Sequence, residues 1–175
     1  MPPIDRREAG LLQGGFWALA GFWAIACVWW AEHLEGMAPC ALCLWERWPY
    51  RALIVLGFVW SGLAALELRP ARPIGILITL VLLAAIAIAG IHVGVEQGWW
   101  PSPLPECMAP HFSGGSFAER LASMPARPAK PCDSPNRLFQ WLPVSMAMID
   151  LLYAVSLLVI GQIVLPRLLT SSRRA

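Results

Sequence analysis

The stretch IGILITLVLLAAIAIAGIHVGV, residues 74–95, decides the class of fold, because it holds no Asp, Glu, Lys or Arg. About 20 apolar residues in a helix cross the hydrocarbon core of a bilayer. Three further segments, at about residues 11–31, 48–68 and 143–165, are comparably long and apolar. No strand-like alternation suggests a membrane barrel. We therefore expect an all-α membrane protein, a bundle of four transmembrane helices that forms one domain over residues 1–175.

The composition agrees with lipid as the surrounding solvent. Hydrophobic residues make up 58% of the chain and charged residues 14%, whereas a soluble domain carries about a quarter charged residues. The net charge of +2 is too small to suggest a nucleic-acid partner. The first apolar segment ends in Trp29, Trp30, Glu32 and His33. It is also longer than the core of a signal peptide, about 7–15 residues, so we interpret it as a retained membrane helix.

The connections between the spans predict an orientation. An even number of spans places both termini on one side, together with the tight turn LRPARP at residues 68–73. That side holds seven arginines near span ends, against six basic residues on the other side, of which four lie in the long loop at about 96–142. Charge in a long loop has less influence on the orientation of the spans than charge near span ends. The positive-inside rule therefore predicts cytoplasmic termini. The loops at about 32–47 and 96–142 then face the periplasmic side of a bacterial inner membrane.

Seven of the ten tryptophans support this orientation, because they fall at the outer ends of the spans as an interfacial belt would. They are Trp29, Trp30, Trp45, Trp48, Trp99, Trp100 and Trp141.

Four of the five cysteines fall on the outer side, where an oxidising compartment lets disulfides persist. They are Cys40, Cys43, Cys107 and Cys132. The fifth, Cys27, lies inside the first span, where a cysteine behaves as a small hydrophobe, and we assign it no chemistry.

The first pair lies in MAPCALCLWERWPY, residues 37–50. Pro39 suits the first turn of a helix, so Cys40 and Cys43 are expected near a helix N-terminus. The helix dipole there favours the thiolate form of a cysteine. Arg47 follows Cys43 by four residues, on the same helical face, and adds a fixed positive charge. A stabilised and accessible thiolate is what disulfide exchange needs.

Two other interpretations of the cysteines stay open from the sequence. All four could bind zinc, although structural zinc sites usually take two close pairs and the second pair here is 25 residues apart. Alternatively, a Cys107–Cys132 disulfide could only staple the long loop, with a stabilisation of about 3 kcal/mol. Four cysteines allow three pairings, and the residues alone do not choose among them.

The long loop contains Ser116-x-x-Glu119, a possible capping box. Phe117, Leu121 and Met124 follow at helical spacing, which predicts a short amphipathic helix on the membrane surface. Such a helix would bring the second cysteine pair close to the first. The alternative is a plain loop with one incidental helical turn.

Taken together, these features resemble the DsbB family of bacterial inner-membrane quinone reductases. PCALCLWER, residues 39–47, is similar to the family motif PC-x-x-C-x-x-ER. CDSPNRLFQWLPVSMA, residues 132–147, resembles the segment from the last cysteine into the fourth span, and IHVGVEQGWWPSP, residues 91–103, resembles the exit of the third span. The resemblance covers about residues 11–165.

The resemblance implies an enzyme that reoxidises a DsbA-like periplasmic thioredoxin-fold oxidase and passes the electrons to ubiquinone, or menaquinone, in the lipid bilayer, with no metal. A reduced partner would attack Cys107. Cys132 would then leave and exchange with Cys40. Cys43 would contact the quinone, and Arg47 would stabilise negative charge on the ring or on Cys43.

Two further candidates for quinone binding come from the same resemblance. His92 falls near the quinone-side histidine of the family, and Glu96 follows one turn later. A histidine bonded to backbone at the membrane interface is the alternative interpretation of His92.

Two other functions remain possible from the sequence. One is a redox protein of the vitamin K epoxide reductase class, whose C-x-x-C usually lies in a later span. The other is a membrane scaffold that disulfides stabilise and that has no turnover. The chain shows no GxGxxG fingerprint of a flavin or nicotinamide enzyme.

Overall fold

The computed structural model of the chain describes residues 5–68, 71–107, 116–122, 130–137 and 143–167. Three long helices, α1 (Arg6–His33), α2 (Ala41–Ala65) and α3 (Ala71–Glu96), come first in the chain. The 3-10 turn η1 (Pro105–Cys107) and the short helix α4 (Phe117–Ala122) follow. Helix α5 (Met146–Val159) continues as the π-helical segment η2 (Ile160–Val164).

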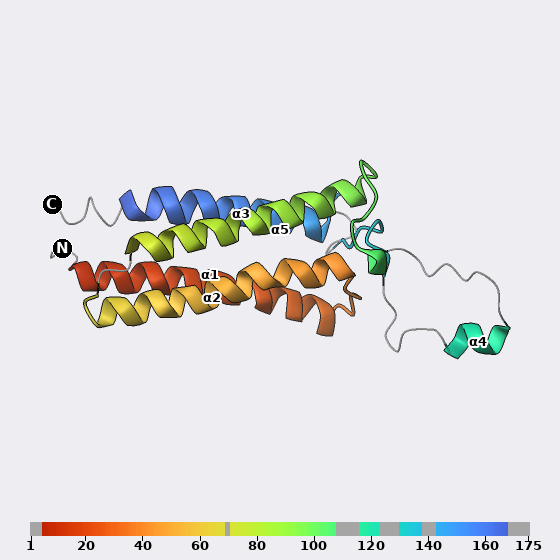
Figure 1. Cartoon of the computed structure of the whole chain (residues 1–175), viewed down its shortest axis with the longest axis horizontal. Helices are drawn as coiled ribbons and strands as arrows, with labels where there is room; N and C mark the ends of the chain where they lie inside the picture. The colour runs from red at the N-terminus through yellow and green to blue at the C-terminus, as the bar shows by residue number, and fades with distance from the viewer. Residues whose placement is uncertain (1–4, 69–70, 108–115, 123–129, 138–142, 168–175) are drawn as a thin grey trace.

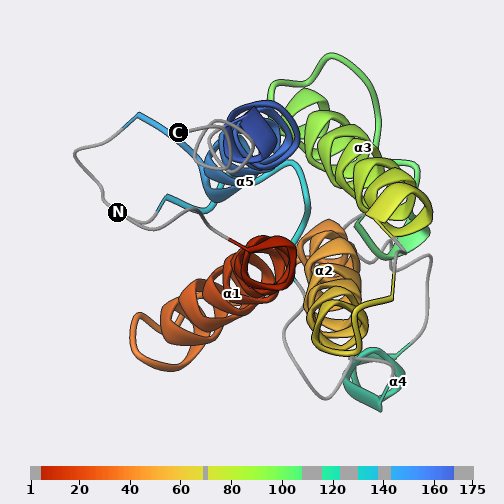
Figure 2. The same ribbon diagram turned by 90° about the vertical axis from the view of Figure 1, so that its left-hand side faces the viewer.

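The four long helices lie side by side along the long axis of the molecule (Figure 1). Viewed from one end, each helix occupies one corner of the bundle, with α1 beside α2 and α3 beside α5 (Figure 2). Helix α1 begins and η2 ends at the same end, and the connection from α1 to α2 lies at the other end. The predicted four-helix, all-α fold is confirmed, and the described part of the chain contains no strand.

Helix α2 begins at Ala41, earlier than the predicted span at about residue 48, because the polar residues before Pro49 stay helical. Cys40 is the N-cap, and its Sγ accepts a hydrogen bond from the Cys43 backbone N–H at 3.2 Å. The two cysteines therefore lie at a helix N-terminus as expected, whereas Pro39 precedes the N-cap instead of lying in the first turn. Glu46 and Arg47 remain inside the helix, since both side chains find ionic partners within the bundle.

Helices α1 and α2 approach most closely at glycine. A Cβ atom added at Gly57 would lie 2.4 Å from the backbone nitrogen of Ala18 and 2.7 Å from the carbonyl oxygen of Gly14. Small residues at a helix interface allow this backbone contact, which is a common way to pack membrane helices. The contact fixes the separation of α1 and α2 and therefore the shape of the site between them.

The core of the bundle is thin. Its fully buried side chains include Trp17, Leu53, Ile78 and Leu82. Only 17% to 28% of each candidate span is buried inside the protein, while the rest of its apolar surface is exposed. Exposed apolar surface on this scale requires lipid around the helices.

The described tryptophans of the predicted belt are 39% to 69% exposed. They lie near the end of α1, near the start of α2 and just after α3, and these helix ends meet at one end of the bundle (Figure 1). This agrees with an interfacial position. Trp141 and the basic residues Arg69, Arg173 and Arg174 lie outside the described residues.

The predicted capping box is present at α4. Ser116 N–H donates to Glu119 Oε2 at 2.8 Å, and Glu119 N–H donates to Ser116 Oγ at 3.3 Å. The short helix is confirmed, and Figure 1 shows it beyond the cysteine end of the bundle. Its Phe117 is exposed, Met124 lies outside the described residues, and a position on the membrane surface stays a prediction.

Candidate active site

The first cysteine pair lies at the start of α2. The Sγ atoms of Cys40 and Cys43 are 2.6 Å apart, and a disulfide bond is about 2.05 Å long, so a small movement closes the pair. Cys40 is buried, whereas Cys43 is partly exposed. The hydrogen bond from the Cys43 side chain lowers the pKa of the Cys40 thiol, although burial opposes this shift. The Cys43 side chain thus favours the thiolate form of Cys40.

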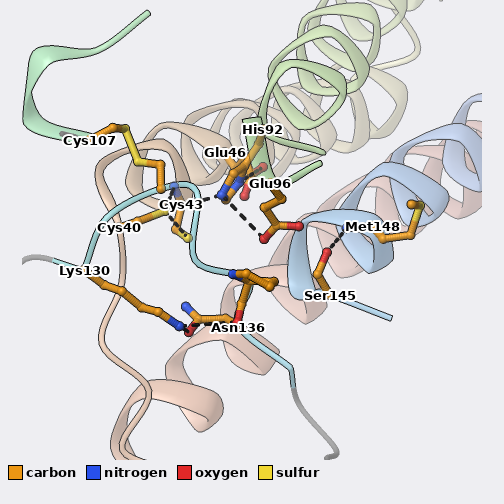
Figure 3. A network of polar contacts seen from close by, with 12 residues as sticks. Cys40, Cys43, Glu46, His92, Glu96, Cys107, Lys130, Asn136, Ser145 and Met148 are labelled. Carbon is orange, nitrogen blue, oxygen red and sulfur yellow. Dashed lines mark hydrogen bonds and ion pairs between the residues drawn. A yellow bond between two sulfur atoms is a disulfide. The ribbon is translucent and has the colours of Figure 1, made fainter. Parts of the chain in front are cut away.

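His92 connects this pair to a buried carboxylate. Its Nδ1 lies 2.8 Å from Glu46 Oε1, and its Nε2 lies 3.5 Å from Cys40 Sγ (Figure 3). Both His92 and Glu46 are buried. Glu96 Oε1 lies 3.9 Å from His92 Nε2. The carboxylate, imidazole and thiol form a chain that can hold or move a proton at Cys40 Sγ.

This geometry corrects one interpretation of His92. A histidine at the interface would bond to backbone, but the ring nitrogens of His92 meet side chains from α2. A carboxylate next to a histidine commonly fixes the orientation and tautomer of the ring. Glu46 therefore belongs to the site, although the sequence analysis gave it no role.

The second cysteine pair forms a disulfide, Cys107–Cys132. Both residues are buried in one apolar cluster with Cys40 and Leu42. Cys107 ends η1, and its carbonyl oxygen accepts a hydrogen bond from the Cys132 N–H at 3.3 Å. The predicted proximity of the two pairs is confirmed.

The disulfide also rules out a zinc site with four thiolates, because two of its four ligands are oxidised. The ligand atoms of Cys40, Cys43 and His92 lie within 4.8 Å of one another. Structural zinc takes four ligands, so these three side chains would not complete such a site.

A cavity of about 180 Å³ lies on the other side of Cys43, between α1, α2 and α5. Cys43 and Arg47 line it, together with mostly apolar side chains such as Trp23 and Ile149. Arg47 forms an ion pair with Glu32 of α1, with Nη1 donating to Glu32 Oε2 at 3.3 Å. The structure thus brings Cys43 and Arg47 to one cavity.

His92 and Glu96 do not line this cavity; they lie on the Cys40 side of the pair. The structure therefore divides the predicted residues between two faces. Cys40, His92 and Glu96 share one face with the outer disulfide nearby, while Cys43 and Arg47 share the cavity.

Two polar cavity residues were missed by the sequence analysis. Tyr50 of α2 donates a hydrogen bond to Asp150 Oδ1 of α5 at 2.6 Å, and both line the cavity. A signal for each existed in the sequence. Tyr50 lies on the helical face of Cys43 and Arg47, and Asp150 is an acidic residue inside the fourth span, where ionisable groups are usually functional.

The cavity fits a flat apolar ligand that carries oxygen atoms. Small-molecule sites are mostly apolar with a few polar groups that orient the ligand. Arg47 Nε and Asp150 Oδ2 are buried and have no hydrogen-bond partner among the described residues. A quinone has two carbonyl oxygens and an apolar ring and tail, so the residues present fit this group.

Comparison with known proteins gives matches to one family. The family model described as disulfide bond formation protein DsbB matches residues 13–164. Disulfide bond formation protein B of Pasteurella multocida is 29% identical over 138 residues, which cover 71% of this chain and 72% of that protein. The protein of the same name from Neisseria meningitidis serogroup A is 34% identical over 84 residues, which cover 46% of this chain and 49% of that protein.

The chain thus spans about half the length of the Neisseria relative that it matches. No solved structure matches it.

Proposed function

The chain belongs to the DsbB family of disulfide bond formation proteins, and from this premise we propose that it oxidises a DsbA-like periplasmic thioredoxin-fold partner and delivers the electrons to membrane ubiquinone or menaquinone. Membership gives the general role, that of a multi-pass membrane oxidoreductase that generates disulfides. The partner, the quinone and the order of the steps are the proposal.

One observation carries it: Cys43 Sγ lies 2.6 Å from Cys40 Sγ and also lines the cavity. Cys40 itself packs in the cluster of the outer disulfide. Electrons that reach Cys40 from the outer pair can therefore leave through Cys43 toward a ligand in the cavity.

The exchange steps balance as follows. A partner thiolate attacks Cys107, and Cys132 leaves as a thiolate. Cys132 then attacks Cys40 of an oxidised inner pair, and Cys43 leaves as a thiolate. A second partner thiolate attacks the mixed disulfide and releases Cys107, and Cys107 resolves the Cys132–Cys40 bond. The partner ends with one disulfide and the inner pair with two thiols.

The residues around Cys43 and Cys40 support the return of the inner pair to its disulfide. A bound quinone supplies an acceptor for two electrons and two protons. Arg47, held by Glu32, places a positive charge in the cavity that stabilises negative charge at Cys43 or at the ring. His92 and Glu46 accept the proton of Cys40 as its sulfur bonds to Cys43.

The proposal includes an orientation in the bacterial inner membrane, with cytoplasmic termini and periplasmic cysteine loops. Support comes from the end of the bundle at which the cysteines lie, which is opposite to the start of α1 and the end of η2. The described tryptophans of the predicted belt lie near the end of α1, near the start of α2 and just after α3, which are at the cysteine end.

The test uses the purified full chain in lipid nanodiscs with ubiquinone and a reduced DsbA-type protein. We expect one partner disulfide for each quinone reduced, and no quinone reduction in Cys43→Ala. Retained quinone reduction in that variant would contradict the mechanism. No thiol consumption by the wild type would favour the scaffold, and thiol-dependent reduction of vitamin K epoxide in place of ubiquinone would favour the class of vitamin K epoxide reductase.

The order of exchange has its own test. In Cys132→Ala the partner, supplied in its oxidised form, should be trapped in a mixed disulfide with Cys107, because the Cys107 thiolate attacks the partner disulfide and one partner cysteine leaves as a thiolate. Mass mapping of the peptides locates the bond. A partner trapped on Cys40 instead would reverse the proposed roles of the two pairs.

A further inference from the structure

The Tyr50–Asp150 pair is the part of the cavity that the disulfide exchange does not use. Tyr50 comes from the second turn of α2 beyond Cys43, and Asp150 comes from the first turns of α5. Both side chains line the cavity that Cys43 also lines. The pair therefore joins two helices at the place where a ligand of Cys43 would sit.

An acidic side chain inside a membrane span is costly, so its retention points to a function. One oxygen of Asp150 has its partner, because Oδ1 accepts the Tyr50 hydroxyl hydrogen at 2.6 Å. The other oxygen, Oδ2, is buried and has no partner in the described part of the chain. A purely structural link between α2 and α5 would need only the first contact and leaves the second oxygen unexplained.

We propose that Asp150 is the acid that gives a proton to a quinone oxygen through Oδ2, and that Tyr50 holds the carboxyl group in place. The inference rests on the proposed function, since it requires a quinone in the cavity. Tyr50 acts as a positioning residue. Its hydroxyl fixes the carboxyl orientation and stabilises the carboxylate once the proton has left, because a hydrogen bond to a charged group is about twice as strong as a neutral one.

The step balances without a further reactant. Cys40 and Cys43 lose two S–H bonds and form one S–S bond, which releases two electrons and two protons. The electrons pass from Cys43 to the acceptor. Asp150 gives one proton at Oδ2 to one quinone oxygen and then takes back one of the two protons that the thiols release, so its carboxyl group is restored. The other thiol proton goes to the second quinone oxygen. The net change is two thiols to one disulfide and one quinone to one quinol.

The neighbours of Asp150 explain why this side chain rather than another would carry the proton. Glu46 is already bonded to His92 on the Cys40 side, and Glu32 is already paired with Arg47. The ionisable or charged groups around the cavity and the pair come from all four long helices: Cys27 and Glu32 of α1, Cys43, Glu46, Arg47 and Tyr50 of α2, His92 of α3, and Tyr153 of α5.

Tyr153 also has its partner, because its hydroxyl donates to the Ala20 carbonyl oxygen at 2.8 Å. Among the carboxyl groups that line the cavity, Asp150 is the one with an oxygen that is both buried and without a hydrogen-bond partner in the described part of the chain.

The first measurement is infrared difference spectroscopy of the wild-type chain in nanodiscs, with and without a short-chain ubiquinone. We expect the C=O stretching band of a protonated carboxyl group to shift when the quinone is added. The band should be absent in Asp150→Asn and should move to higher frequency in Tyr50→Phe, where Oδ1 loses its hydrogen bond. No quinone-dependent carboxyl band in the wild type would overturn the proposal.

The second measurement separates the two half-reactions in single turnovers. Asp150→Asn should slow quinone reduction by the reduced inner pair by about 10²-fold, the lower end of the range for a lost acid catalyst. Oxidation of the partner by the Cys107–Cys132 disulfide should stay within about twofold of wild type. Ser156→Ala, an exposed change on the same helix, is the control and should leave both rates unchanged.

The pH profile of quinone reduction should also lose an inflection in Asp150→Asn and regain one in Asp150→Glu. Quinone reduction within about twofold of wild type in Asp150→Asn would overturn the role of Asp150 alone. Quinone reduction that survives Cys43→Ala would overturn the proposed function itself, so the two failures are distinguishable.

Discussion

Replacing Gly57 with alanine should push α1 and α2 apart. The added Cβ would lie 2.4 Å from Ala18 N, 2.7 Å from Gly14 O and 2.9 Å from Ala18 Cα. All three atoms belong to backbone, so no flexible side chain can move aside. The helices must therefore separate or bend at this point, and the cavity between them must change with them.

The change in the free energy of unfolding of Gly57→Ala follows from two opposing effects. Overpacking a tight interior costs about 1–3 kcal/mol, whereas alanine favours a helix over glycine by about 1 kcal/mol. Gly62 lies on the same helix, and a Cβ there would meet nothing within 4 Å. Gly62→Ala thus gains the same helix propensity without the clash. The two variants should differ by about 1–3 kcal/mol, which corresponds to roughly 2–12 °C in Tm for a chain of this size.

The assay is thermal unfolding of both variants in the same detergent, followed by circular dichroism or by exposure of buried cysteine. Gly57→Ala should melt below Gly62→Ala, and its affinity for ubiquinone should fall because the cavity wall has moved. Equal melting temperatures would refute the close approach of α1 and α2 at Gly57.

Three further predictions concern the site. Glu32→Gln should release Arg47 and raise the KM for quinone about fivefold, which corresponds to about 1 kcal/mol for a partly exposed ion pair; an unchanged KM would show that Arg47 does not need this partner. His92→Asn should slow the closing of the inner disulfide by about 10²-fold in stopped-flow assays, and a normal rate would remove His92 from the proton path. The hydrogen bond from Cys43 lowers the pKa of Cys40, so Cys40 in the reduced protein should react with iodoacetamide at a pH below the ordinary thiol pKa of about 8.5. In Cys43→Ala the inflection should move to higher pH; an inflection that does not move would contradict the assigned cause.

The fold could be predicted because a membrane span follows from length and apolarity alone. Residues 74–95 illustrate this, since they lie within α3, which spans Ala71–Glu96. The start of α2 was less predictable. Glu46 and Arg47 lie just before the predicted span at about 48–68, but partners on two other helices make both side chains compatible with the helix. The sequence around a residue does not show which side chain of another helix will contact it.

The same distinction holds for the site: spacing along one helix could be predicted, and contacts between helices could not. The spacing of Cys40, Cys43 and Arg47 along one helix placed them near each other, and Cys43 and Arg47 do share the cavity. The contact of Tyr50 with Asp150 joins residues 100 positions apart, so no local pattern could reveal it. The position of His92 beside Cys40 and outside the cavity could not be predicted either, because it depends on how far α3 is rotated about its axis.

The position of the C-x-x-C across a helix start explains how one pair can serve two different reactants. Cys40 is the N-cap and lies outside the helix, in the cluster with the outer disulfide. Cys43 lies one turn deeper and lines the cavity among spans that face lipid. A C-x-x-C in the middle of a helix would place both sulfurs at membrane depth, and one in a loop would place both at the surface. In the proposed mechanism, a pair that crosses this boundary accepts electrons from the outer cysteine pair beside Cys40 and releases them to an apolar ligand beside Cys43.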